Sequence, residues 1–134
     1  APAAICRKVA YLPQSGGAIE VWGDGLQTRS FLFIDECIEA TRRLMDSDFI
    51  GPVNIGSEEM VTINELVDTA ARVAGKEVRK MHKLDAPLGV RGRNSNNDLI
   101  REELGWDYSQ TLEEGIRKTY DWISSQIKTP TLAV

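Results

Sequence analysis

The stretch Trp22-Gly-Asp-Gly-Leu-Gln-Thr-Arg-Ser-Phe31 decides how this chain of 134 residues folds. Its Gly23-Asp24-Gly25 segment predicts a turn that closes a short strand, Ile19 to Trp22. The residues from Thr28 to Ile34 are rich in Thr, Phe and Ile and predict an extended segment. A dinucleotide-binding turn would instead lead from a strand directly into a helix, with its glycines at the phosphate. The pattern therefore predicts a turn between two extended segments and no dinucleotide site.

Three segments flank this stretch and extend the pattern. Residues 1–12 predict a helix, with Pro2 in its first turn. Residues 35–46 predict a second helix, and its apolar side chains fall on one face. These are Ile34, Cys37, Ile38, Thr41, Leu44 and Met45. The run Pro52-Val-Asn-Ile-Gly56 predicts a short buried strand followed by a polar turn.

Two capping boxes mark the starts of two further helices. In Thr62-Ile-Asn-Glu65 the hydroxyl and the carboxylate can each satisfy a free backbone amide, and Gly75 suits the end of this helix. Thr111-Leu-Glu-Glu114 repeats the pattern and opens a last helix that extends to about Lys128. The remaining segments are a strand from Glu77 to Lys83, a loop from Pro87 to Asn97 and a short helix from Asp98 to Leu104.

The tally is about five helices and three or four short strands. It predicts an α/β fold, or α+β for this portion taken alone. The order of the strands does not follow from the sequence.

Composition and charge narrow the function classes. Sixteen Lys and Arg residues against twenty Asp and Glu give a net charge of −4, which argues against binding to nucleic acid or to a membrane surface. The longest apolar run, Phe31 to Ile34, is far shorter than a membrane span. A basic stretch from Arg72 to Arg101 could receive a small anion, although such a stretch can also be a solvated face.

The chain has two cysteines and one histidine, Cys6, Cys37 and His82. They are too few for a disulfide scaffold or a zinc site, so we expect no metal and free thiols in a reducing cytoplasm. Spacing places both cysteines in the core, and the three tryptophans are expected there too. No Gly-x-Ser-x-Gly or His-x-x-x-His motif is present, and no catalytic constellation can be assembled. The residues alone indicate a ligand-binding domain without catalytic groups of its own.

The segment from Trp22 to Phe31, with Ile34-Asp-Glu36 after it, resembles the C-terminal part of extended short-chain dehydrogenase/reductase enzymes. These are the nucleotide-sugar epimerases and dehydratases. Leu104-Gly-Trp106 before Thr111 to Gly115 agrees with the same group. Within it, the segments Ala1 to Lys8 and Val90-Arg-Gly-Arg-Asn-Ser95 are similar to the GDP-mannose 3,5-epimerase subfamily. The resemblance covers nearly the whole chain and fades after Lys128.

The resemblance implies a specific division of labour. Family members carry an N-terminal Rossmann domain that binds NAD and holds a Tyr-x-x-x-Lys catalytic pair, and neither of its motifs occurs in this chain. Residues 1–128 are therefore expected to be the nucleotide-sugar binding domain alone, with a frayed tail over residues 129–134. The full enzyme is expected to be an NAD-dependent homodimer, and this portion alone is expected to be inactive.

Five residues match the substrate-binding positions of the family. Arg93 is expected to bind the nucleotide diphosphate, because a guanidinium can fork onto two oxygens and Gly92 lets backbone approach closely. Gln27, Thr28 and Arg29 match the loop that contacts base, ribose or phosphate, and Lys8 matches a substrate-contacting lysine. No residue of this chain is expected to be catalytic.

Two alternatives remain open. The chain could belong to a related epimerase, dehydratase or decarboxylase of UDP- or dTDP-sugars, which a preference for UDP over GDP would indicate. It could also be a stand-alone nucleotide-sugar binding module without a catalytic half.

Overall fold

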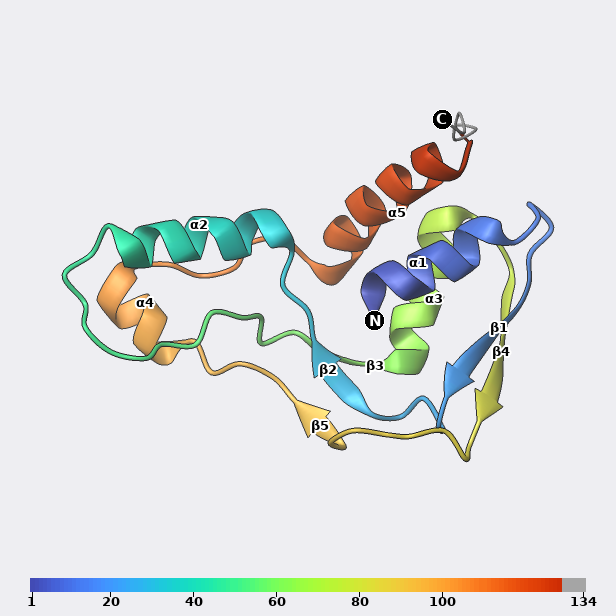
Figure 1. Ribbon diagram of the computed structural model, residues 1–134, viewed down its shortest axis with the longest axis horizontal. Coiled ribbons are helices and arrows are strands. Elements are labelled where there is room, and N and C mark those ends of the chain that lie inside the picture. Colours follow the sequence, from blue (N-terminus) through green and yellow to red (C-terminus); the bar gives the residue numbers. More distant parts are fainter. Residues whose placement is uncertain (129–134) are drawn as a thin grey trace, which may run out of the picture.

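The computed structural model describes residues 1–128, which form an elongated molecule with helices at both ends (Figure 1). Its elements are α1 (Pro2–Tyr11), β1 (Gly17–Trp22), β2 (Thr28–Ser30), α2 (Ile34–Met45), β3 (Met60–Thr62), α3 (Ile63–Ala74), β4 (Val78–Lys83), β5 (Gly92–Arg93), α4 (Asp98–Leu104) and α5 (Leu112–Lys128). The α/β class and the five helices expected within this part of the chain are confirmed. The strands there number five, because β3 and β5 are too short to give a periodic signal.

The strands form two small sheets whose order the sequence did not reveal. In the first sheet β1 pairs with β4 in parallel, from Gly17 opposite Val78 to Trp22 opposite Lys83. In the second sheet β2 lies in the middle, antiparallel to β3 and parallel to β5. The turn at residues 23–25 thus connects the two sheets, and glycine suits it because Gly23 and Gly25 have φ of 71° and 70°.

The main core lies where α1, α3 and α5 pack together beside β1, at the right in Figure 1. Its fully buried side chains include Cys6 and Val9 of α1 and Leu66 and Val67 of α3. Ile116 and Ile123 of α5 complete it. The burial of Cys6 confirms its expected place in the core, and burial raises the pKa of its thiol to about 11.

A second, smaller hydrophobic cluster joins α2 to α4. These two helices lie at the other end of the molecule (Figure 1). The cluster consists of Ala40 of α2, Ile100 of α4, and Trp106, with partly buried side chains around them. Trp106 follows α4 and is 2% exposed, which confirms its expected place in the core. Gly105 ends that helix with φ of 57°, a left-handed conformation suited to glycine.

Both capping boxes form as predicted. Thr62 Oγ1 accepts a hydrogen bond from the Glu65 amide at 3.0 Å, and Glu65 Oε2 accepts one from the Thr62 amide at 2.7 Å. Thr111 and Glu114 repeat this exchange at the start of α5, at 3.3 and 2.7 Å. The hydrogen bonds that the Thr62 and Thr111 amides donate to these carboxylates hold the pKa of Glu65 and Glu114 below the usual range.

The structure overturns two predictions about local structure. Pro52 to Gly56 is not a strand: its backbone takes no part in a sheet, and the Gly56 carbonyl accepts from a side chain, Asn97 Nδ2, at 2.9 Å. The expected loop from Pro87 to Asn97 contains the short strand β5, which pairs with β2. In both places the outcome depends on partners distant in the sequence.

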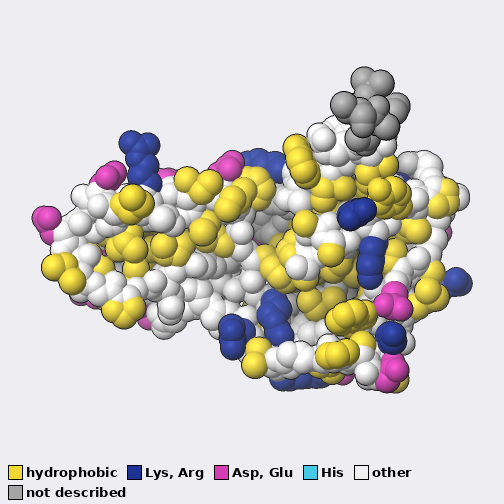
Figure 2. All heavy atoms as spheres, in the orientation of Figure 1, with side chains coloured by type: hydrophobic (Ala, Val, Ile, Leu, Met, Phe, Trp, Pro, Cys, Tyr) yellow, Lys and Arg dark blue, Asp and Glu magenta, His cyan; other side chains and the backbone are white. Residues whose placement is uncertain are grey.

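Burial differs from expectation on α2 and at two tryptophans. The apolar face of α2 points outward, with Ile34, Ile38 and Met45 all more than half exposed, while the helix buries Glu36 and Ala40 instead. Figure 2 shows hydrophobic side chains at the surface of that end of the molecule. Trp22 and Trp122 are 53% and 65% exposed, so their expected place in the core is wrong. The tail expected to fray, residues 129–134, lies outside the described residues.

Candidate functional site

Two arginines occupy paired positions on adjacent strands of the second sheet. Arg29 of β2 and Arg93 of β5 are opposite each other in the parallel register, so their side chains leave the same face of the sheet. Both line a pocket of about 370 Å³. Its other lining residues are Ser30, Leu32, Asn54, Ile55, Gly56, Ser57, Asn94 and Ser95. Figure 2 shows dark blue basic side chains gathered over β2 and β5.

Close approach of the two strands depends on a glycine. A Cβ added at Gly92 would lie 2.8 Å from Thr28 Oγ1, too close for two non-bonded atoms. The backbone amide of Thr28 donates to the Arg91 carbonyl at 2.9 Å, which fixes the register at this point. Gly92 therefore lies close to the Thr28 side chain of β2, and its expected role toward a diphosphate stays a prediction.

Within residues 1–128 neither arginine has an acidic partner. Arg29 Nη1 donates only to the Thr28 carbonyl, at 2.6 Å, and no hydrogen bond or ion pair joins the Arg93 side chain to the described residues, although its backbone pairs with β2. Like charges placed opposite each other on neighbouring strands repel. This arrangement suits a bound anion whose charge would offset both guanidinium groups.

The turn before β2 is held from three sides. Arg91 pairs with Asp24 at 3.0 Å, and Asn64 Nδ2 donates to the Asp24 carbonyl at 3.1 Å. The Asp24 carboxylate also accepts from the Leu26 amide at 2.9 Å. The Leu26 amide and the Arg91 guanidinium together hold the pKa of Asp24 below its usual range. Arg91 therefore braces the turn, while Arg93 faces the pocket.

Gln27 lies between this turn and β2. Its Nε2 donates to the Trp22 carbonyl at 3.1 Å, while its Oε1 is buried without a hydrogen-bond partner in the described part of the chain. A buried acceptor with no donor is costly and is often satisfied by a ligand or by water. The structure thus brings four of the five predicted residues, Gln27, Thr28, Arg29 and Arg93, to one region.

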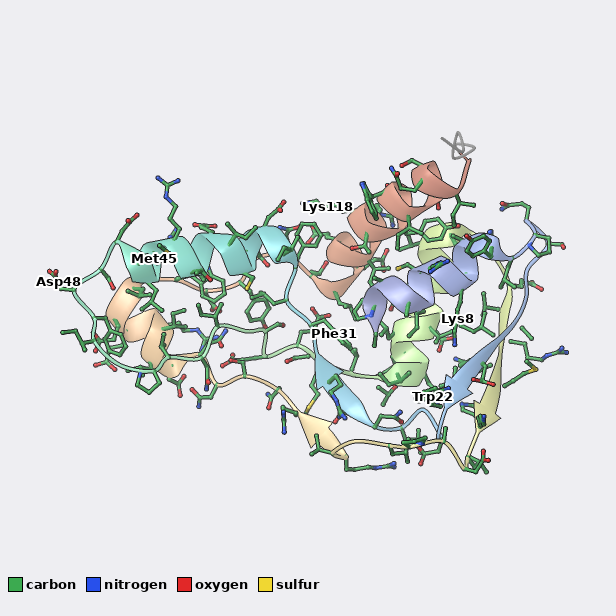
Figure 3. All side chains as sticks on the ribbon, in the orientation of Figure 1. Lys8, Trp22, Phe31, Met45, Asp48 and Lys118 are labelled. Carbon is green, nitrogen blue, oxygen red and sulfur yellow. The ribbon has the colours of Figure 1, made fainter. Side chains whose placement is uncertain are left out.

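Lys8 lies apart from that region. Its Nζ donates to the Glu20 carbonyl at 2.9 Å, and it lines a second pocket of about 460 Å³ beside α1 and β1. Trp22 lines the same pocket, and its indole donates to Glu20 Oε1 at 2.9 Å (Figure 3). The backbone of Trp22, which Gln27 binds, connects the two regions.

A third, apolar pocket of about 290 Å³ was not anticipated from the sequence. It lies between the N-terminus of α1 and the start of α5, with Phe31, Phe33 and Ile34 in its wall. The Lys118 ammonium lies 5.0 Å from the centre of the Phe33 ring. These residues come from segments far apart in the sequence, and each segment alone is typical of core, so no local pattern indicates the pocket.

The described residues do not fit a dinucleotide cofactor. The described helices that follow strands begin after Phe33, Thr62 and Asn97, and none of these starts is a glycine-rich turn that could receive a pyrophosphate. Nor do residues 1–128 contain a group of three or more His, Cys, Asp and Glu side chains placed to hold a metal ion. Over the same range no helix has the length and apolar character needed to cross a membrane.

Several solved structures have the same fold as this chain. Solved structures of the same shape include UDP-glucose 4-epimerase from Thermotoga maritima with UDP-glucose, with TM-score 0.85 and 21% identity over 95% of this chain and 40% of that one. UDP-glucuronic acid 4-epimerase from Bacillus cereus, in complex with UDP-glucuronic acid and NAD, matches with TM-score 0.77 and 25% identity, covering 91% and 38%. The fold is that of a part of the extended short-chain dehydrogenase/reductases, as the sequence predicted.

Sequence comparison assigns the chain to one family within this class. A family model described as GDP-mannose 4,6 dehydratase matches residues 3–119, and the chain belongs to that family. It is 53% identical over 128 residues to GDP-mannose 3,5-epimerase of Arabidopsis thaliana, covering 96% of this chain and 33% of the relative. UDP-glucuronic acid decarboxylase 6 of the same plant is 34% identical over 75% of this chain and 29% of its own length. The chain thus spans about a third of the length of these relatives, and the resemblance stated from the sequence is confirmed.

Proposed function

We propose that residues 1–128 form the nucleotide-sugar binding domain of an NAD-dependent epimerase, with GDP-mannose as the substrate class and 3,5-epimerisation as the reaction. The observation that carries the proposal is the register-matched pair Arg29 and Arg93, which lines one pocket without an acidic partner in the described chain. The 53% identity to GDP-mannose 3,5-epimerase supports the choice of base and sugar.

Each proposed contact has a chemical reason. Arg29 and Arg93 can each fork onto two oxygens of a diphosphate, whose negative charge removes the repulsion between them. Gln27 and Thr28 offer polar groups at the next positions, and the buried Gln27 Oε1 can accept a donor from the ligand. Lys8 would contact the substrate at the far side of Trp22. None of these residues is proposed as catalytic, and their task is to hold the substrate still.

The rest of the reaction is proposed for a different part of a longer protein. An NAD-binding domain would supply the redox chemistry and the acid and base groups, and the whole enzyme would be a homodimer. Several structural neighbours are complexes with NADPH or NAD, which supports a nicotinamide cofactor in the class. The free cysteines Cys6 and Cys37 are consistent with a reducing cytoplasm.

Calorimetric titration with GDP-mannose and with UDP-glucose tests the proposal. We expect binding of GDP-mannose, and expect Arg93→Ala and Arg29→Ala each to weaken it by roughly 10- to 100-fold, because each loses charge-assisted hydrogen bonds. Arg79→Ala is the matched control, since Arg79 is exposed on β4 in the other sheet and the substitution removes the same charge. It should change affinity by less than about 2-fold.

Three outcomes would change the assignment. Tighter binding of UDP-glucose than of GDP-mannose would favour a UDP-sugar enzyme, such as the decarboxylases to which the chain is also related. If all three variants lost the same affinity for GDP-mannose, the effect would come from the net charge of the protein and not from contacts of Arg29 and Arg93 with the ligand. Epimerisation of GDP-mannose by this polypeptide without a second domain would overturn the division of labour.

A further inference from the structure

Two walls of the arginine pocket have no regular secondary structure. One is residues 54–57 and the other is residues 94–95, which belong to the segment 94–97 between the end of β5 and the start of α4. Backbone groups in such segments must find partners outside a ladder or a helix. The walls are also in direct contact, because a Cβ added at Gly56 would lie 2.6 Å from Ser95 Cβ.

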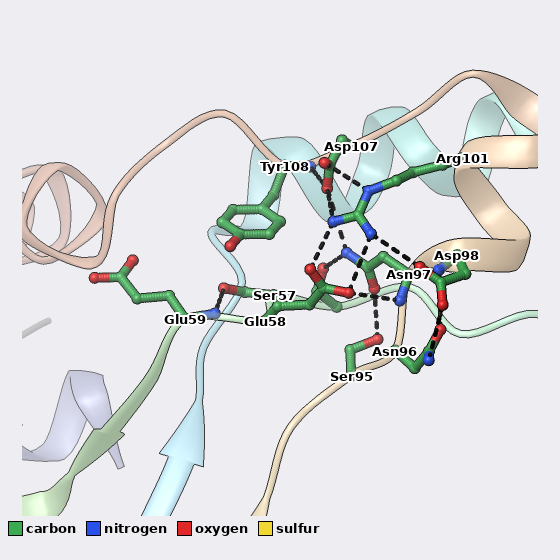
Figure 4. A network of polar contacts seen from close by, with 11 residues as sticks. Ser57, Glu58, Glu59, Ser95, Asn96, Asn97, Asp98, Arg101, Asp107 and Tyr108 are labelled. Carbon is green, nitrogen blue, oxygen red and sulfur yellow. Dashed lines mark hydrogen bonds and ion pairs between the residues drawn. The ribbon is translucent and has the colours of Figure 1, made fainter.

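Asn97 joins the two walls (Figure 4). It is completely buried, with none of its surface exposed. Its Nδ2 donates to the Gly56 carbonyl at 2.9 Å, and its Oδ1 accepts from Ser95 Oγ at 2.6 Å. We call these two Asn97 bonds the bridge. A backbone hydrogen bond from the Ser95 amide to the Ser57 carbonyl, at 3.3 Å, also connects the two walls.

Asn97 is itself fixed by an ionic network. Its backbone amide donates to Glu58 Oε1 at 3.0 Å, and Glu58 Oε2 pairs with Arg101 at 2.6 Å. Arg101 also pairs with Asp107 at 2.8 Å and with Asp98 at 3.4 Å. The guanidinium lowers the pKa of Glu58 and Asp107, so both acceptors stay ionised near neutral pH.

The side chain of Arg93 has no tether of its own in the described chain. No hydrogen bond or ion pair joins its side chain to residues 1–128, and β5 contains only two residues. Repulsion from Arg29 on the adjacent strand would push the segment away from β2. The first side-chain tether after Arg93 is the Ser95–Asn97 bond.

We propose that Asn97 is a positioning residue for the anion pocket: by bridging Gly56 and Ser95 it holds the Arg93-bearing segment at the spacing a diphosphate needs. The residue does not line the pocket and acts through its neighbours. The ligand side of this inference rests on the proposed function, whereas the bridge itself can be tested without a ligand.

Asn97→Asp tests the bridge. The variant keeps the size of the side chain but replaces the donor to Gly56 with a carboxylate, 3.5 Å from Asp107 in the present geometry. We expect affinity for GDP-mannose and for inorganic pyrophosphate to fall by roughly 10-fold or more, because arginines held loosely lose the benefit of preorganisation. Affinity for guanosine, which lacks the diphosphate, should change by less than about 2-fold.

Asn96→Asp is the charge-matched control one residue away. Asn96 is exposed and its Oδ1 accepts from the Asp98 amide, a bond that an aspartate retains. The variant loses the exposed bond from Asn96 Nδ2 to Asp98 Oδ2 at 3.2 Å, which is not one of the bonds that join Asn97 to Gly56 and Ser95. This variant should bind pyrophosphate as the unaltered chain does. If Asn97→Asp does not fold, as judged by near-UV circular dichroism, Asn97→Ser removes the same bridge without adding charge and should show the same pattern.

Hydrogen exchange in the absence of ligand separates this inference from the proposed function. Loss of the bridge should speed exchange at residues 92–96 and 54–58 and leave α1 and α3 unchanged. If the unaltered chain does not bind GDP-mannose, the proposed function fails and the exchange data alone decide whether the bridge exists. Equal loss of guanosine and pyrophosphate binding, or exchange that rises throughout the molecule, would overturn the positioning role.

Discussion

Residue by residue, the cations of the basic stretch from Arg72 to Arg101 are either paired with a group of the described chain or left without such a partner. Arg72 pairs with Glu113 at 2.9 Å, Arg91 with Asp24, and Arg101 with three carboxylates. Lys76 donates to the carbonyls of Val9, Ala10 and Leu12 at the end of α1. Most charges of the stretch thus pair within the described residues, whereas Arg93 faces a pocket, and the reception of an anion there stays a prediction. Spacing could not tell these apart because their partners lie far away in the chain.

Acid should weaken the Arg101 network in a predictable direction. The pKa of Glu58 and Asp107 is lowered in the folded state, chiefly by hydrogen bonds from Arg101. Their contribution to stability is therefore fully present above the unfolded-state pKa, near 4, and is lost as pH falls through the lowered folded values. Arg101→Met should reduce stability at neutral pH and flatten its fall with acid. Urea unfolding between pH 3 and 7 checks this, and an unchanged slope would contradict it.

At the scale of elements, the sequence was informative where a local rule governs the structure. The start and end of α3 follow from a capping box and a glycine, all within the helix and its ends. By contrast, Val53 and Ile55 favour a strand by propensity, yet they pack on the second cluster while side chains satisfy nearby backbone groups. The amphipathic pattern of α2 identified a helix but not which face is buried, because that depends on α4 and Trp106.

Removing either cap should cost a similar, modest amount of stability. Thr62→Ala and Thr111→Ala each remove a hydroxyl that accepts from the third residue of the helix. We expect each to lower the free energy of unfolding by about 1 kcal/mol. Thr41→Ala is a suitable control, because Thr41 is an exposed residue inside α2 whose hydroxyl donates only to the Cys37 carbonyl. It should stay within about 0.5 kcal/mol of the unaltered chain in urea unfolding.

For the molecule as a whole, the unequal size of the two hydrophobic clusters matters most. The core of α1, α3 and α5 contains ten buried side chains, whereas the cluster beneath α2 and α4 contains three. The candidate pocket lies between them, bounded on one side by β2 and on the other by residues 54–57 and 94–95. The geometry of the pocket therefore depends on how firmly the small cluster is attached to the large one. This dependence could not be predicted from the sequence, which indicates burial but not how buried groups divide into clusters.

Glu36 is a principal link between the two ends. The side chain is 6% exposed on α2, and its Oε1 accepts from the Ser109 amide at 2.6 Å, the Ser109 hydroxyl at 2.8 Å and the Gln110 amide at 3.0 Å, just before α5. Glu36 is thus a buried acceptor that ties α2 to the segment that leads into α5.

Glu36→Ala should loosen the small cluster while leaving the large one folded. The substitution leaves two backbone donors near the interior without an acceptor, and we expect a loss of about 2–3 kcal/mol. Hydrogen exchange should rise in α2 and α4 and stay constant in α1 and α3, because the larger core does not contain this bond. Glu39→Ala, which removes an exposed carboxylate from the same helix, should change neither region. A uniform rise across all four helices would instead mean that the molecule unfolds as one cooperative unit and that the pocket is as rigid as the core.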